Sequence, residues 1–279
     1  HMILTKKNRI QTFTEKGWWG KDTLYSLFQD ALTSCKDQEA LVDPENRDNI
    51  TGDAPKRLSF DDIDKTVERY ATIFFEQGLR KGDIAIIQLP NVVELPMVYL
   101  ALSKLGIICS PIPMQYGAYE ITSIIAETEP KAFISIEIFN STSHAEQFSS
   151  VFNNGEVKFA LGEIENFINL HDYNPADELY ESQQSYASDN SITANDIFTI
   201  CWTSGTTGTP KGVPRSHNLW LPMAKAAAFV SETEKGDTLL NPFPMINMAS
   251  IGGFLFNWLL CCLLYTSDAA DEEDSVDLG

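Results

Sequence analysis

The stretch TSGTTGTPKG, Thr203 to Gly212, combines small hydroxyl side chains with glycines, one proline and one lysine. Glycines let backbone N–H groups approach a ligand closely, and consecutive N–H groups in a turn form a concave anion site. The hydroxyl groups add donors, Lys211 adds a positive charge, and Pro210 stiffens the segment before it. These properties together predict a loop that binds a polyphosphate.

The spacing excludes two common phosphate-binding loops. The pattern Gly-x-x-x-x-Gly-Lys-Ser/Thr fails because Pro210 stands where the second glycine is needed, and Gly-x-Gly-x-x-Gly is absent. The apolar run 196–202 predicts a buried strand before the loop, and residues 216–232 have helical periodicity. We therefore expect the loop to lie between a strand and a helix. A flexible, exposed Gly/Thr/Ser linker is the alternative interpretation.

Upstream of the loop, helical and strand periodicity alternate. Ser59 and Asp62 form a capping pair for a helix that Gly78 ends. Asn91 can cap a helix that runs to Gly106, although Pro96 must kink this helix or delay its start. Because parallel strands need crossover connections, this alternation predicts an α/β fold with parallel-rich sheets covered by helices. The expected helices are 59–78, 91–106, 118–130 and 143–152, and the expected strands are 83–89, 107–112, 131–136, 156–161, 196–202 and 237–244.

Two further segments complete this prediction. Residues 169–195 are polar and lack clear periodicity, which is typical of a linker over the surface. The apolar run IGGFLFNWLLCCLLY, residues 251–265, is shorter than the roughly 20 residues needed to cross a bilayer. We expect it to form a buried helix, and we expect no transmembrane segment.

Composition narrows the possible partners and the compartment. The formal net charge of -19 disfavours nucleic acid as a partner, since a polyanion is repelled over most of the surface. The five cysteines form no Cys-x-x-Cys pair, and no secretory signal is recognised, so a reducing cytoplasm is expected. None of the four histidines has neighbours typical of a metal site.

The segment TSGTTGTPKGV, residues 203–213, resembles the phosphate-binding motif of the AMP-forming adenylating enzymes. This family includes acyl-CoA synthetases, aryl-acid ligases, nonribosomal peptide adenylation domains and luciferases. Other segments resemble the family in the same order along the chain, over roughly residues 13–260. They are ALSKLGIICSPI at 101–112, SHN at 216–218 and NPFPMINMASIGG at 241–253.

The resemblance implies attack of a carboxylate on the α-phosphate of ATP, which gives an acyl adenylate and pyrophosphate, followed by transfer of the acyl group to a thiol. It implies ATP, Mg²⁺ and coenzyme A as cofactors. The acyl pocket would include Asn247, Met248 and Ser250. The residues implied in binding the phosphates are Thr203, Ser204, Gly205, Thr206, Thr207, Gly208, Thr209, Pro210, Lys211 and Gly212.

The pocket segment departs from the family pattern at two positions. Asn247 stands where many relatives have a histidine, and Ser250 where a glycine is usual. Asparagine donates and accepts hydrogen bonds but does not titrate near neutrality. The alternative is that Asn247 only caps or bridges the turn before the helix at Ser250.

The resemblance also implies parts that we do not find in the sequence. These are an adenine-binding segment, a magnesium-binding glutamate, a hinge and a C-terminal domain with the catalytic lysine. We interpret residues 1–260 as a truncated N-terminal AMP-binding domain, inactive as a fragment, and 261–279 as a non-native acidic tail. Three hypotheses follow: an acid:CoA ligase, an aryl-acid adenylating enzyme that loads a carrier-protein thiol, or a non-catalytic nucleotide-binding module.

Overall fold

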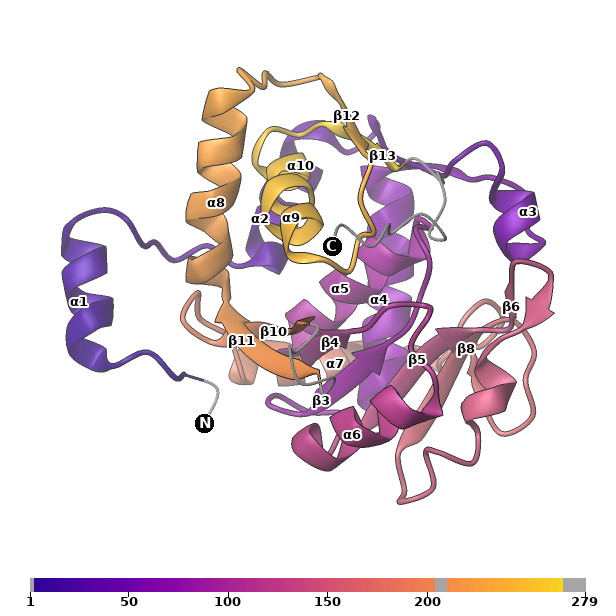
Figure 1. Cartoon of the computed structure of the whole chain (residues 1–279). Helices are drawn as coiled ribbons and strands as arrows, with labels where there is room; N and C mark the ends of the chain where they lie inside the picture. Colours follow the sequence, from indigo (N-terminus) through magenta and orange to yellow (C-terminus); the bar gives the residue numbers. More distant parts are fainter. Residues whose placement is uncertain (1–2, 204–209, 268–279) are drawn as a thin grey trace, which may run out of the picture.

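The fold is built around two sheets, with helices packed on and between them (Figure 1). The computed structural model describes residues 3–203 and 210–267. In the larger, seven-stranded sheet all neighbouring strands are parallel except β10 and β11. The predicted α/β class is confirmed. In spatial order the strands are β11 (Lys211–Ser216), β10 (Ile197–Thr203), β4 (Ile108–Pro111), β3 (Ile84–Ile87), β5 (Ala132–Ile136), β8 (Val157–Leu161) and β9 (Ile168–Asn169).

Alternating side chains cover both faces of the larger sheet, because successive residues of a strand point to opposite sides. Ile87 and Ile134 belong to the large core that includes α4 (Phe60–Glu76) and α5 (Glu94–Leu105). Their neighbours Ile86 and Phe133 belong to a second cluster. That cluster also contains side chains of α6 (Ala118–Thr128) and η1 (Ala145–Phe148).

The smaller, four-stranded sheet joins the two ends of the described chain. Its order is β12 (Thr238–Asn241), β13 (Leu264–Ser267), β1 (Glu39–Val42) and β2 (Arg57–Ser59). β13 pairs in parallel with both β12 and β1, whereas β1 and β2 are antiparallel. Trp258 stacks on Phe60 at 6.0 Å between ring centroids and lies 5.8 Å from the Tyr265 ring, so aromatic packing fastens this sheet to α4.

The predicted start of α4 is confirmed, whereas the predicted capping of α5 by Asn91 is wrong. Ser59 Oγ accepts from the Asp62 amide, and the Asp62 carboxylate accepts from the Ser59 amide, as in a capping box. The α5 helix begins at Glu94 without a side-chain cap, which places Pro96 in its first turn, where proline is tolerated. Asn91 does not cap this helix, because its side chain is hydrogen-bonded to a distant segment instead.

The expected linker 169–195 contains a helix, α7 (Asp177–Asp189). The sequence conceals it because most of its side chains are exposed, and Gln183 is the one residue of the helix that is fully buried. The helix is held by tertiary contacts: Tyr186 packs on Phe75 of α4, with centroids 5.4 Å apart, and on the Arg80 guanidinium. The expected helix 143–152 is also corrected, since only the short 3₁₀ turn η1 forms there.

The apolar run 251–265 is not one helix. It follows α9 (Met248–Ser250) with the π-helical turn η2 (Ile251–Leu255) and α10 (Phe256–Leu260), and then changes to β13 after a turn in which Cys262 has φ of 49°. Tyr265 and Ser267 are buried while Leu264 and Thr266 are half-buried. Burial thus alternates from one residue to the next, as it does in a strand. The sequence conceals the change because both parts are apolar. That the native domain ends at residue 260 stays a prediction.

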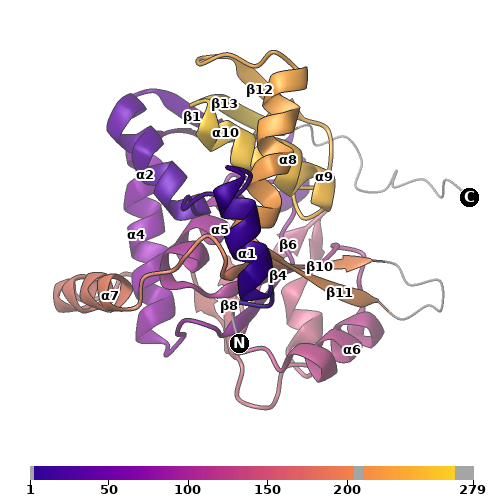
Figure 2. The ribbon, with the colours of Figure 1, turned by 90° about the vertical axis from the view of Figure 1, so that its left-hand side faces the viewer.

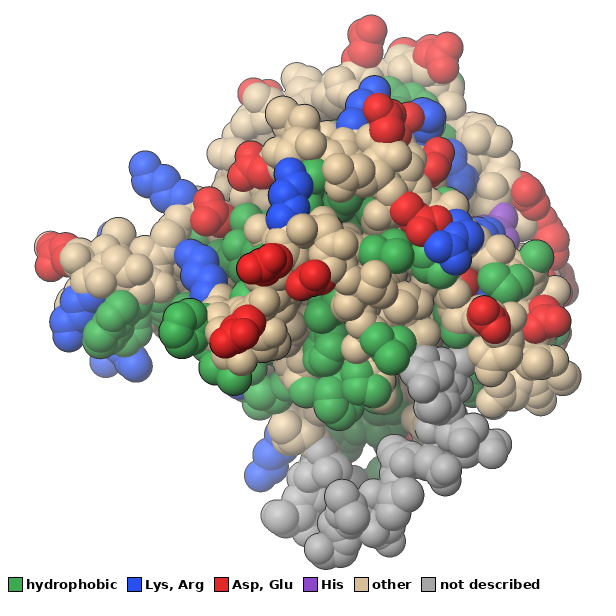
Figure 3. Space-filling view, turned by 90° about the horizontal axis from the view of Figure 1, so that it is seen from above, with side chains coloured by type: hydrophobic (Ala, Val, Ile, Leu, Met, Phe, Trp, Pro, Cys, Tyr) green, Lys and Arg blue, Asp and Glu red, His purple; other side chains and the backbone are tan. Residues whose placement is uncertain are grey.

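The remaining elements are peripheral. The helix α1 (Lys7–Glu15) has no buried residue and stands away from the body in Figure 1, while in Figure 2 it lies in front of the body. In Figure 3, charged side chains of both signs are interspersed on the face seen from above, around a group of hydrophobic side chains. No helix within the described ranges is long and apolar enough to cross a membrane. The other elements are α2 (Leu24–Cys35), α3 (Arg47–Thr51), β6 (Ile138–Phe139), β7 (Thr142–Ser143) and α8 (His217–Val230).

Replacing His144 by phenylalanine should reduce the loss of stability in acid. His144 lies between the rings of Phe139 and Phe148, its Nε2 has no partner among the described residues, and burial lowers its pKa to about 4. The unfolded chain therefore takes up a proton below about pH 6.5 that the folded chain refuses until about pH 4, so stability falls over this window.

At about pH 5 the lowered pKa of this histidine reduces the free energy of unfolding by about 2 kcal/mol relative to neutral pH. The drop in unfolding free energy between about pH 7.5 and about pH 5 should shrink by that amount in His144→Phe. Urea denaturation at both pH values measures it. An unchanged drop would show that His144 binds its proton equally well in the folded and the unfolded chain.

Candidate functional site

The candidate phosphate loop is closed at its base by two antiparallel strands. Thr203 is the last residue of β10 and Lys211 the first of β11, and the two face each other in the register. Thr203 Oγ1 also donates to the Lys211 carbonyl at 3.5 Å. Of the predicted phosphate-binding residues, Thr203, Pro210, Lys211 and Gly212 are described. Ser204, Gly205, Thr206, Thr207, Gly208 and Thr209 lie outside the described residues.

The expected strand–loop–helix arrangement is wrong in one respect. The loop is followed by β11, and the helix α8 begins only at His217. The sequence hides this strand because KGVPRS lacks apolar alternation and contains Pro214. On the edge of the sheet a proline is tolerated, since one side of an edge strand has no ladder partner. The loop therefore connects two strands of a hairpin rather than a strand to a helix N-terminus.

β10 ends and β11 begins at the carboxyl edge of the parallel strands, where α/β sheets commonly bind ligands. β10 is parallel to β4, and β4 to β3, so all three end at the same edge. Trp202 Nε1 donates to Ser110 Oγ at 2.9 Å, which fastens the end of β10 to the end of β4. The buried Gln88 side chain donates to the carbonyls of Pro113 and Tyr116, each at 3.0 Å, and so fixes the loop that follows β4.

Gly212 is needed for close packing of this hairpin. A Cβ at this position would lie 2.9 Å from Ile200 Cγ2 and 3.1 Å from the Trp202 ring. Replacing Gly212 by alanine should therefore destabilise the chain by roughly 1–3 kcal/mol, the usual range for overpacking. Urea denaturation measures the change. The matched control is Gly253→Ala, because a Cβ at Gly253 meets no atom within 4 Å and the variant should keep its stability. Equal stabilities of both variants would contradict the packing argument.

The predicted acyl-pocket residues lie on the segment after β12, and two of them have structural partners. Asn247 is the N-cap of α9, with Oδ1 accepting from the Ser250 amide at 2.8 Å. Ser250 is fully buried, and its Oγ accepts from Asn241 Nδ2 at 2.7 Å. Met248 is half-buried against the main core. Asn247 therefore caps α9, and its role in an acyl pocket stays a prediction.

Asn241 ties this segment to the four-stranded sheet. Its Nδ2 also donates to the Tyr265 hydroxyl at 3.1 Å, and its Oδ1 accepts from the Phe243 amide at 3.1 Å. Burial raises the pKa of Tyr265 far above neutrality, so its hydroxyl stays protonated. The cluster of Asn241, Ser250 and Tyr265 is thus a neutral hydrogen-bonded anchor rather than an acid–base group.

Asn91 was missed as a candidate for the site. It lies in the connection between β3 and α5 and is buried, 7% exposed. Its Oδ1 accepts from the Met245 amide at 2.7 Å, and its Nδ2 donates to the Phe243 carbonyl at 3.0 Å. These partners are more than 150 positions away, so no local pattern identifies them. The one local signal was a polar residue directly after a buried strand.

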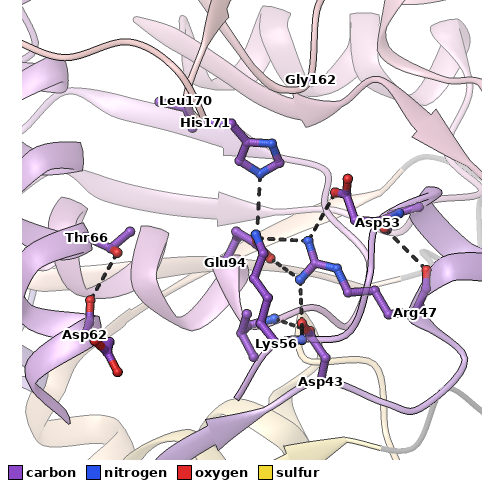
Figure 4. A network of polar contacts seen from close by, with 12 residues as sticks. Asp43, Arg47, Asp53, Lys56, Asp62, Thr66, Glu94, Gly162, Leu170 and His171 are labelled. Carbon is purple, nitrogen blue, oxygen red and sulfur yellow. Dashed lines mark hydrogen bonds and ion pairs between the residues drawn. The ribbon is translucent and has the colours of Figure 1, made fainter. Parts of the chain in front are cut away.

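A buried charge network lies beside this connection (Figure 4). Arg47 is fully buried and donates from Nη1 to Asp43 at 2.5 Å and to Glu94 at 2.8 Å. Lys56 Nζ lies 2.5 Å from Glu94, and His171 Nε2 lies 3.6 Å from it. The network joins α3 to the first turn of α5, and sequence spacing does not reveal it because its members come from separate segments.

The pKa values of the two buried carboxylates of the network, Asp43 and Glu94, are shifted in opposite directions. Burial alone would raise the pKa of Glu94, but the nearby His171 side chain, the hydrogen bonds from Arg47 and the charges of Arg47 and Lys56 hold it well below its usual range. Burial raises the pKa of Asp43, against the attraction of Arg47. Glu94 is therefore the firmly ionised partner of the guanidinium.

His217 is buried and has structural partners. His217 is fully buried, accepts from the Leu24 amide through Nδ1 at 3.1 Å and stacks on Phe198. Burial lowers its pKa to about 3, so it is neutral at physiological pH. Its interpretation as a helix-start residue is confirmed. No group of three or more His, Cys, Asp or Glu side chains suited to a metal is found among residues 3–203 and 210–267.

The carboxyl edge of the parallel sheet thus holds both the β10–β11 hairpin and the connection after β3 that binds the segment following β12. The AMP-binding enzyme family model matches residues 28–275, and the chain belongs to this family. Pseudomonine synthase PmsE of Pseudomonas entomophila is 28% identical over 228 residues, 80% of this chain and 35% of that protein. Long-chain-fatty-acid–CoA ligase FadD13 of Mycobacterium tuberculosis is 26% identical over 223 residues, 79% of this chain and 42% of that protein.

Solved structures confirm the fold. The apo structure of Mycobacterium smegmatis MbtA superposes with a TM-score of 0.78 at 19% identity, covering 96% of this chain and 47% of that one. At this identity the likeness concerns the fold alone. The chain spans less than half the length of each of these three proteins.

Proposed function

We propose that this chain provides the phosphate loop and the acid-binding segment of an AMP-forming acid–thiol ligase. The observation that supports this best is the placement of the candidate loop at the carboxyl edge of the parallel sheet in a chain of the AMP-binding family. The carboxylate of the substrate attacks the α-phosphate of ATP, pyrophosphate leaves, and a thiol then takes the acyl group from the adenylate.

Lys211 is the charged group proposed to meet the outer phosphates. It is exposed at the start of β11 and held in register with Thr203. A fixed positive charge and backbone donors at this point stabilise the charge that develops on departing pyrophosphate. Mg²⁺ bound with ATP would neutralise the remaining phosphate charge, and we assign no ligand for it among the described residues.

The acid-binding role is proposed for Asn247, Met248 and Ser250. Asn247 is half-buried, and its Nδ2 can donate to a carboxylate while Oδ1 caps α9. Met248 supplies an adaptable apolar surface. Ser250 acts through Asn241, which it holds in place. No titratable group of this segment is available near neutrality, so recognition of the acid rests on hydrogen bonds and shape.

The acceptor thiol is proposed to be coenzyme A, with a carrier-protein thiol as the second candidate. Relatives named as fatty-acid–CoA ligases favour the first. Relatives named pyochelin synthase PchD and enterobactin synthase component E favour the second. Incubating preformed adenylate with coenzyme A or with a phosphopantetheinyl carrier protein distinguishes the two, because only the true acceptor yields a thioester.

Acid-dependent ATP–pyrophosphate exchange tests the proposed function. It is measured with panels of aliphatic and aryl acids on the longest gene product that contains this sequence. Exchange that requires one class of acid supports the proposal. ATP binding without exchange for any acid would favour a non-catalytic nucleotide-binding module instead.

A further inference from the structure

We propose that Asn91 is a positioning residue that holds the pocket segment, residues 241–250, against the larger sheet and so sets selectivity for the acid. The inference rests on the proposed function, because it concerns the same pocket. It adds a residue from the connection between β3 and α5, next to the buried charge network. The argument starts from how the segment is held.

The pocket segment has little regular structure between Asn241, where β12 ends, and Met248, where α9 begins. Its backbone groups therefore depend on side-chain partners, because a buried N–H or C=O without a partner is costly. Asn241 binds one end of the segment and Asn247 caps the other. Asn91 binds the middle, at the Phe243 carbonyl and the Met245 amide.

The carboxamide of Asn91 is suited to this because it donates and accepts at once. It binds backbone groups two residues apart, which fixes both the position and the direction of the segment. Tyr99 lies in the second turn of α5, and its hydroxyl donates a longer hydrogen bond to the Met245 carbonyl at 3.4 Å. The side chains of Phe243 and Met245 are thereby placed differently, the first 42% exposed and the second buried.

Asn91 is itself held firmly from the side away from the pocket segment. Asp43 Oδ1 accepts from the Val93 amide at 2.9 Å, and Glu94 is bound to Arg47. The Asn91 carbonyl accepts from Ser267 Oγ at 3.5 Å. The charge network therefore fixes the connection before α5, and Asn91 transmits that position to the pocket segment 241–250. Selectivity depends on such distances, since a pocket discriminates acids by the shape it presents.

Hydrogen exchange on the 279-residue chain tests the positioning directly. In Asn91→Ala we expect amide exchange in residues 243–247 to rise on the order of tenfold, as expected when one net hydrogen bond is lost. Asn91→Asp keeps the acceptor for Met245 but loses the donor to Phe243, so an intermediate rise is expected. The control is Val67→Ala on α4, a buried truncation with no polar contact to the segment. Equal exchange in Asn91→Ala and the control would overturn the proposal.

Kinetics of the active gene product test the consequence for selectivity. Asn91→Ala should raise KM for the preferred acid on the order of tenfold and change the ratio of kcat/KM between two acids of different size, with KM for ATP little changed. Equal increases in both KM values, or an unchanged ratio, would overturn the selectivity role. If the wild type adenylates no acid, the proposed function fails and selectivity with it, while hydrogen exchange still decides whether Asn91 holds the segment.

Discussion

Replacing Arg47 by methionine should lower the free energy of unfolding by roughly 3–5 kcal/mol, the range for breaking one side of a buried ion pair. The variant keeps most of the volume of the side chain but leaves Asp43 and Glu94 buried without the guanidinium. Urea denaturation at neutral pH measures the loss. The control is Arg57→Met, whose partner Glu39 is at the surface, and which should change stability far less.

The pH dependence of the same variant provides a second check. In the wild type the lowered pKa of Glu94 gives stability that is present above its ordinary pKa of about 4.3 and is lost as the pH falls further. Without Arg47 the pKa of Glu94 rises relative to wild type, so the variant loses less stability than wild type when this carboxylate is protonated. Its deficit relative to wild type should therefore shrink as the pH falls. A deficit that grows with acidification would contradict this account.

Replacing Lys211 by methionine should reduce acid-dependent pyrophosphate exchange roughly a hundredfold to a thousandfold, the usual cost of removing one fixed group that stabilises transition-state charge. The effect should appear mainly in kcat, because the charge on pyrophosphate develops in the transition state. Exchange is measured in the longest gene product that contains the chain.

The matched control for this prediction is Lys225→Met. Lys225 is an exposed lysine on α8, so the substitution changes the same charge without touching the hairpin. It should leave exchange within twofold, a margin set by ordinary surface substitutions. If both variants lose the same activity, Lys211 acts through the general field of the protein rather than at the loop. If neither loses activity, the proposed role of Lys211 is wrong.

Much of the fold could be predicted because the period of the apolar residues is a local property. The strand 84–87 is predictable as a short continuous apolar run after a turn, and the helix 60–76 because its apolar side chains recur on one face. The hairpin strand 211–216 and the helix 177–189 were missed, because one is a polar edge and the other is stabilised by Tyr186 against α4. In both segments, contacts with distant parts of the chain determine the secondary structure more than the local sequence pattern does.

Some residues of the candidate site can likewise be recognised from the local sequence, and others cannot. The loop 203–212 could be recognised because its composition alone is suited to phosphate, and Asn247 because it stands in a segment similar to the family. Asn91 and Arg47 could not, since their partners lie far along the chain and only the fold brings them together. A single sequence contains no signal of such pairings.

The placement of β13 between β12 and β1 has a consequence for biosynthesis. Residues 84–216 contain every strand of the larger sheet, so that sheet can assemble before synthesis of the chain is complete. Strands β1 and β2 are synthesised before the larger sheet. Their partner β13, which pairs with β1, lies more than 200 positions further along the chain. Until Leu264–Ser267 leaves the exit tunnel, the edge of β1 is open to a wrong strand, and this interval is when a nascent chain would most need a chaperone.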